Sequence, residues 1–60
     1  MKVVIRARFK RKDNGETINM IVDTIEIREN NIHVRYYDEQ RGKFVGQDFQ
    51  SDEIISIELL

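Results

Sequence analysis

Residues 3–10 alternate between apolar and polar side chains, and this pattern constrains the fold more than any other feature of the chain. A period of two places successive side chains on opposite faces of a strand, whereas a helix repeats every 3.6 residues. The segment therefore predicts a β-strand with one buried and one exposed face. The residues on the predicted buried face are Val3, Ile5, Ala7 and Phe9.

Three turn signals divide the following residues into further strands: Asp13-Asn14-Gly15, Asn30-Asn31 and Gln40-Arg41-Gly42. Asn-Gly is typical of a two-residue type I′ hairpin, in which both central residues need a positive φ. Asparagine and glycine also tolerate the left-handed backbone at the other two turns. Centring the hairpins on these turns predicts three strand registers: Phe9 opposite Met20, Ile27 opposite Val34, and Tyr36 opposite Val45.

The segment Glu16–Arg28 contains no strong turn signal, but its apolar phase changes halfway along. The apolar residues are at even positions up to Val22 and at odd positions from Ile25 onward. One extra residue near Asp23-Thr24 would explain the change. A β-bulge there bends the strand, and small barrels use such a bend to pass from one sheet to the other.

The C-terminal part of the chain predicts a cap and one helical turn at Ser51-Asp52-Glu53, followed by a last strand. That strand carries Ile55, Ile57 and Leu59 on one face. The other face carries Ser56, Glu58 and Leu60.

Together these segments predict an all-β single domain over residues 1–60. We expect a small five-stranded antiparallel barrel, SH3-like or Sm-like, with a short helical turn before the last strand and that strand beside the first. An OB-like barrel is an alternative, although OB folds are usually longer, and an open curled meander is another. A domain of this size buries only about 60% of the surface of its unfolded chain. Oligomerisation would therefore aid its stability.

Three runs of sequence follow one another in an order known from other small barrels: Arg8-Phe9-Lys10, Ile25-Glu26-Ile27 and residues 31–38, with a glycine-bearing turn after them. This order resembles that of the small archaeal SH3-like chromatin proteins and covers most of the chain. Those proteins are strongly basic and carry a tryptophan on the DNA-binding sheet, whereas this chain is slightly acidic and has no tryptophan. The resemblance therefore concerns the fold and transfers no function.

The composition excludes several classes of protein. The chain has no cysteine, so it can form neither a disulfide framework nor a thiolate metal site. Its longest apolar runs, Val3-Val4-Ile5 and Met20-Ile21-Val22, are three residues long, far short of the roughly 20 residues that a membrane-spanning helix needs. No signal peptide is visible, and we expect a cytoplasmic location.

The sequence offers no credible catalytic or cofactor site. The single histidine, His33, is predicted to lie opposite Asp48, and such a pair can act as a general base. No serine, cysteine or second carboxylate is placed to complete a site, so a surface ion pair is the expected role. The three glycines, Gly15, Gly42 and Gly46, are predicted at turns or bulges rather than in a phosphate-binding loop. We expect Gly46 to leave room for Arg35 across the sheet. The prediction is no enzyme, no metal and no cofactor.

The charges of the chain are strongly separated. The first twelve residues hold six cations and no acid, whereas the other 48 hold four cations and all eleven acids, a balance of −7. A basic strand can bind a polyanion such as nucleic acid, it can be neutralised by cross-strand acids, or it can protect a sheet edge. The predicted register places Asp23 opposite Arg6. If the last strand lies on the other side of the first, Glu58 and Glu53 are further counterions. The candidate polyanion-binding residues are Arg6, Arg8, Lys10 and Lys12.

Several apolar residues fall out of phase with the predicted core. Tyr37 and Phe44 are predicted to be direct cross-strand neighbours, and a contiguous apolar patch on a small domain often marks a binding site. The candidate partner-interface residues are Ile21, Tyr37 and Phe44, and the other outward residues are Val4, Ile54 and Leu60. We therefore expect a non-enzymatic protein-binding or self-assembling module, in the manner of a small regulator or inhibitor. The alternative is a nucleic-acid-binding barrel that uses the basic first strand, with Tyr37 and Phe44 as stacking platforms.

Overall fold

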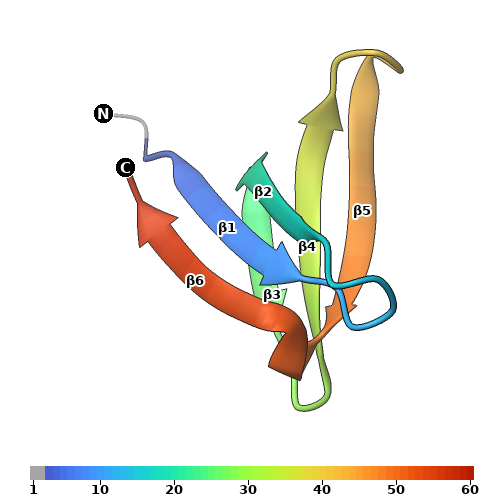
Figure 1. Ribbon diagram of the computed structural model, residues 1–60. Coiled ribbons are helices and arrows are strands. Elements are labelled where there is room, and N and C mark those ends of the chain that lie inside the picture. The colour runs from blue at the N-terminus through green and yellow to red at the C-terminus, as the bar shows by residue number, and fades with distance from the viewer. Residues whose placement is uncertain (1–2) are drawn as a thin grey trace.

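The computed structural model describes residues 3–60 and is all-β (Figure 1). Two three-stranded antiparallel sheets have the strand orders β2-β1-β6 and β3-β4-β5. We call them sheet A and sheet B, and within residues 3–60 they do not close into a barrel. No helix in these residues is long and apolar enough to cross a membrane. The elements are β1 (Ile5–Lys10), β2 (Thr17–Val22), β3 (Thr24–Ile27), β4 (Asn31–Asp38), β5 (Lys43–Gln50), η1 (Ser51–Glu53) and β6 (Ile54–Leu59).

The chain passes from sheet A to sheet B at Asp23, where the sequence predicts an extra residue. β2 ends at Val22 and pairs with β1, whereas β3 begins at Thr24 and pairs with β4. The backbone N–H of Asp23 donates to the carbonyl of Arg35 at 2.7 Å. The predicted bend is confirmed, and the single predicted strand is two strands that belong to different sheets.

The core lies between the two sheets and draws residues from both. Phe9 of β1 is fully buried and stacks on Phe49 of β5, with ring centroids 3.9 Å apart and an interplanar angle of 6°. Because the two rings come from different sheets, this stack fixes one sheet against the other. The buried residues are Ala7, Phe9, Val22, Ile32, Val34 and Phe49.

The first hairpin has a longer loop than predicted. Phe9 lies opposite Ile18 rather than Met20. Gly15 donates its N–H to the carbonyl of Arg11 at 2.8 Å, and Gly15 has a φ of 71°. No described residue other than glycine has a positive φ, which Asn14 would need in a type I′ turn. The predicted turn type is therefore wrong, and the register is displaced by two residues.

The second hairpin is displaced in the same way, and the third is as predicted. Ile27 lies opposite Ile32 rather than Val34. Tyr36 lies opposite Val45, and Gly42 has a φ of 67°. A displacement of two residues keeps every side chain on its face of the sheet, whereas a displacement of one would reverse the faces. The predicted buried faces of β1, β2 and β4 are therefore correct although two registers are wrong.

The last strand returns beside the first, as predicted, but it contains an irregularity. The register of β1 with β6 shifts between Arg8 and Phe9, so that Phe9 lies opposite Ile54. Ile54 packs against the core, whereas Ile55 is exposed. The prediction that Ile54 points outward is therefore wrong. η1 covers the predicted helical turn, although its N-cap is Gln50 rather than Ser51.

Candidate functional site

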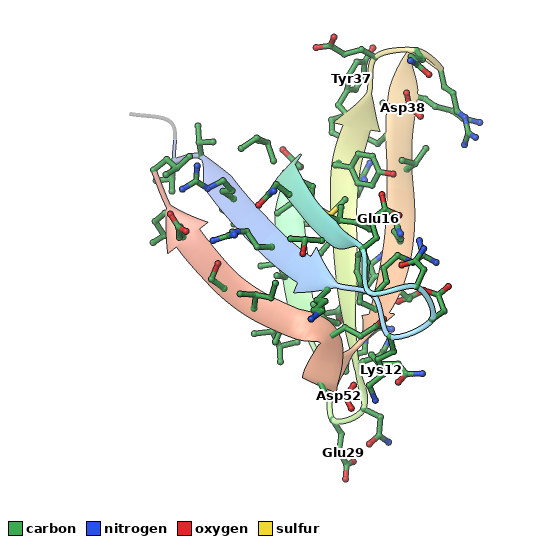
Figure 2. The ribbon with its side chains drawn as sticks, in the orientation of Figure 1. Lys12, Glu16, Glu29, Tyr37, Asp38 and Asp52 are labelled. Atoms are coloured by element: carbon green, nitrogen blue, oxygen red, sulfur yellow. The ribbon has the colours of Figure 1, made fainter. Side chains whose placement is uncertain are left out.

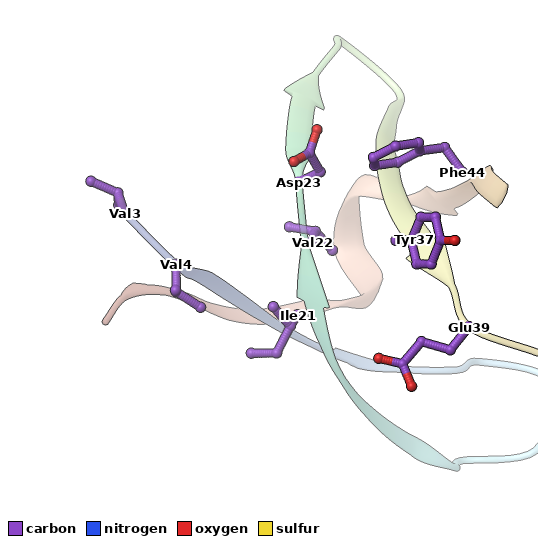
Figure 3. Close-up of a pocket in the computed structure, with 8 residues that line it drawn as sticks. All are labelled: Val3, Val4, Ile21, Val22, Asp23, Tyr37, Glu39 and Phe44. Atoms are coloured by element: carbon purple, nitrogen blue, oxygen red, sulfur yellow. The ribbon is translucent and has the colours of Figure 1, made fainter. Parts of the chain in front are cut away.

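An open groove of about 590 Å³ lies beside the bend between the two sheets (Figure 3). One side is formed by the start of the described chain and the end of β2, and the other side by the far end of the β4–β5 hairpin. Figure 3 shows Val4 and Ile21 on one side of the groove and Tyr37, Phe44 and Glu39 on the other. The lining residues are Val3, Val4, Ile21, Val22, Asp23, Tyr37, Glu39 and Phe44.

The groove exists because β4 and β5 are longer than β3. The last pair that joins β3 to β4 is Thr24 with Arg35, but β4 continues to Asp38 and stays paired with β5. The pair Tyr37–Phe44 therefore projects past the end of β3. Ile21 lies opposite Arg6, on the face of β2 that points away from the core. The bend at Asp23 brings this outward residue of sheet A next to the projecting hairpin of sheet B.

The two aromatic rings of the groove are held in place although both are exposed. Tyr37 and Phe44 meet edge to face, with ring centroids 5.2 Å apart and an interplanar angle of 78°. The guanidinium carbon of Arg35 lies 4.7 Å from the centroid of the Phe44 ring. Tyr37 is 52% exposed and Phe44 is 46% exposed. Side chains that are already ordered lose less conformational entropy when a partner binds.

Among the described residues, the lining of the groove contains two acids and no base, although the Arg35 guanidinium lies beside it on Phe44. Asp23 and Glu39 both line it, and neither forms an ion pair within residues 3–60. Their carboxylates flank an apolar floor of valine, isoleucine and aromatic side chains. This combination favours an apolar ligand that carries positive charge at its ends.

All three predicted interface residues, Ile21, Tyr37 and Phe44, lie in this groove, although they come from three different strands. Val4 joins them, as its outward phase suggested. The prediction that Val3 is buried is wrong, because it is 59% exposed and lines the groove. The sequence did not identify Asp23 or Glu39 as groove residues. The role of these residues as an interface stays a prediction.

The basic strand is largely paired with acids of the same chain. Arg6 lies opposite Ile21 rather than Asp23, so its predicted counterion is wrong. It instead pairs with Glu58 at 2.5 Å, as the closing-strand alternative anticipated. Lys12 forms an ion pair with Asp52 at η1, and Figure 2 shows these two side chains next to each other.

Two of the candidate polyanion-binding residues remain without an ion pair inside the described chain. Arg8 donates to the side chain of Asn19 at 2.8 Å, and Lys10 is exposed. Neither forms an ion pair with another residue between 3 and 60. Of the four candidate polyanion-binding residues, only Arg8 and Lys10 therefore lack an acidic partner within residues 3–60.

His33 and Asp48 lie opposite each other, as predicted. The Nδ1 atom of His33 is 2.9 Å from Oδ1 of Asp48, and Asn31 donates to the same oxygen at 3.0 Å. The His33 ring also covers Gly46, where an added Cβ would lie 2.8 Å from Cε1 of the imidazole. Gly46 therefore leaves room for His33, and the prediction that it accommodates Arg35 is wrong. Residues 3–60 hold no group of three possible metal ligands.

Comparison with models of known protein families, with curated proteins and with solved structures finds no match to this chain.

Proposed function

We propose that this chain is a non-enzymatic protein-binding module and that its groove takes an apolar segment of a partner protein. The observation that carries the proposal is the convergence of Ile21, Tyr37 and Phe44 on one open surface. Aromatic residues that are exposed yet ordered are typical anchors of protein interfaces. By occupying its partner, such a module would act as a small regulator or inhibitor.

The two acids of the groove lining add a chemical preference to this proposal. Asp23 and Glu39 favour a partner segment with lysine or arginine beside its apolar residues, because complementary charges raise association rates and fix the register of binding. The same carboxylates repel phosphate groups. Together with the internal pairing of Arg6 and Lys12, they support a protein rather than a nucleic acid as the partner.

The finer description of the fold belongs to the same proposal. The strand orders of the two sheets, the strand that bends from one to the other, and the short helical turn before β6 support an SH3-like arrangement. SH3-like folds carry many unrelated functions, so this arrangement by itself does not select one.

The test is affinity purification from the native host, with the lysate divided into nuclease-treated and untreated halves. We expect specific proteins to be retained from both halves by the wild-type chain and lost with Phe44→Ser. Ile27→Ser is the matched control, since Ile27 is 67% exposed and lies outside the groove. Loss of all captured material after nuclease treatment would instead support the nucleic-acid alternative. Equal capture by the wild type and Phe44→Ser would show that the groove is not the binding surface.

A further inference from the structure

The edge strand β6 exposes apolar side chains on the face that elsewhere forms the core. Ile57 lies opposite Ala7, which is fully buried, and Leu59 lies opposite Ile5. Directly opposite residues share a face of the sheet, so Ile57 and Leu59 are on the core side of sheet A. They are nevertheless 38% and 72% exposed, and Ile55 is 49% exposed. Sheet B does not cover this edge of sheet A.

Within residues 3–60, β6 pairs only with β1, so its backbone is also open on one side. Leu60 donates its N–H to the carbonyl of Val4 at 2.8 Å. Alternate residues of an antiparallel strand direct both backbone groups to the same neighbour. Glu58 therefore shares the direction of Leu60 toward β1, while Ile57 and Leu59 direct their N–H and C=O groups to the open edge.

An apolar edge of this kind pairs with another strand unless charged residues or proline protect it. Residues 54–59 contain neither lysine nor proline, and Glu58 is their only charge. That charge is already paired with Arg6. The edge is therefore suited to strand pairing and carries no unpaired charge that opposes it.

We propose that β6 is a homodimer interface, in which two copies of the chain pair their β6 strands antiparallel about a twofold axis at Ile57. The paired β6 strands then join sheet A of one copy and sheet A of the other into one continuous antiparallel sheet. Ile57 faces Ile57 of the second copy, and Ile55 faces Leu59 of the second copy. The backbone groups that Ile57 directs to the open edge thus meet those of Ile57 in the second copy, and the exposed side chains of Ile57 and Leu59 from both copies gather on one face.

Charge complementarity identifies the occupant as a second copy. On the outer face of this register, Glu58 of the second copy lies opposite Ser56, which lies opposite Arg8 within the chain. Arg8 has no ion pair in residues 3–60, and only its Nε atom is held, by Asn19. Arg6 holds the Oε2 atom of Glu58, so the pairing brings the other carboxylate oxygen of the second copy's Glu58 toward Arg8. The adjacent register would place two Glu58 side chains opposite each other, and directly opposed like charges are destabilising.

The first experiment measures the solution mass by sedimentation equilibrium over a wide range of protein concentration. Pairing through one strand buries less surface than the roughly 1,200–2,000 Å² of stable complexes, so we expect concentration-dependent association. The mass should rise from the 7.2 kDa of one chain toward twice that value. Leu59→Lys and Ile57→Lys should remain monomeric, with folding checked by circular dichroism.

Ile21→Lys is the matched control for these variants, because Ile21 is an exposed isoleucine of the same sheet that lies in the groove instead of on β6. It should dimerise as the wild type does while losing the binding proposed for the groove. The dimer proposal and the groove proposal can therefore be refuted separately. A wild-type chain that stays monomeric at all concentrations, or a dimer that survives Leu59→Lys, overturns the proposal.

The second experiment tests the register by cross-linking, which is simple because the chain has no cysteine. Cα atoms of a hydrogen-bonded antiparallel pair are about 5.5 Å apart, within the range of about 4.4–6.8 Å that a disulfide spans. Ile57→Cys should therefore give a covalent dimer under mild oxidation, whereas Ile21→Cys should not. Equal cross-linking of the two variants contradicts the proposed register.

Discussion

Replacing two isoleucines by alanine separates the core from the proposed binding surface. Ile32 is 2% exposed between the sheets, whereas Ile21 is 56% exposed in the groove. A buried Ile→Ala change costs about 2–5 kcal/mol, because it removes apolar burial and leaves a cavity. Full burial of an isoleucine is worth about 1.5–3 kcal/mol. Ile21 has less than half of that burial and leaves no enclosed cavity, so Ile21→Ala should cost about 1 kcal/mol or less.

The assay is urea-induced unfolding followed by far-UV circular dichroism, with the free energy of unfolding obtained by linear extrapolation. Domains have about 0.05–0.15 kcal/mol of stability per residue, which for 60 residues is about 3–9 kcal/mol. Ile32→Ala can therefore unfold the chain outright. Ile32→Val, expected to cost about 0.5–1.5 kcal/mol, keeps the comparison measurable against Ile21→Val, expected near zero. Equal losses at positions 32 and 21 would show that Ile21 belongs to the core, and the groove would not be a binding surface.

Three further predictions concern local contacts. Gly46→Ala should destabilise the chain because the new Cβ would meet the His33 ring at 2.8 Å; the loss should disappear in a His33→Ala background, and an unchanged loss there would refute the contact. Gly15→Ala should cost about 1–2 kcal/mol from backbone strain alone, since Gly15 has a φ of 71° and no atom within 4 Å of an added Cβ; a thermal melt that does not shift would contradict this. Glu58→Gln should cost at most about 1 kcal/mol, because its ion pair with Arg6 is partly exposed; the difference from wild type should shrink with added salt, and a salt-independent loss would point to another contact.

The sequence predicts the faces of the strands better than their registers. An Asn-Gly pair favours a two-residue hairpin, but Gly15 is equally suited to the last position of a four-residue loop. The two loops place Phe9 opposite different partners while leaving it on the same face. Periodicity therefore cannot distinguish them, and only the backbone contacts of Arg11 and Gly15 do.

Burial on β6 was harder to predict for a different reason. Ile54 and Ile55 are both apolar, so the alternation does not reveal the irregularity opposite Phe9. The phase places Ile57 and Leu59 correctly on the core side of the sheet. Whether they are buried depends on how far sheet B extends over them, which is a property of the packing of the two sheets.

The sequence predicted Ile21, Tyr37 and Phe44 as interface residues, but it predicted neither the groove nor the rest of its lining. The outward phase of Ile21, Tyr37 and Phe44 can be predicted from each strand alone. The approach of β2 to the far end of the β4–β5 hairpin depends on the bend at Asp23 and on the unequal lengths of β3 and β4. Glu39 could not be assigned to the site, because a turn residue has no phase.

Chemical-shift mapping tests the central claim, that the groove binds a protein segment, most directly. Peptides would be selected from a random display library against the immobilised chain, and the enriched peptide titrated into the ¹⁵N-labelled protein. We expect enrichment of apolar peptides with flanking lysine or arginine, and the largest shifts at Val4, Ile21, Tyr37 and Phe44. Largest shifts on the outer face of β1 at Arg8 and Lys10, or a peptide that binds Phe44→Ser as tightly as the wild type, would contradict the account.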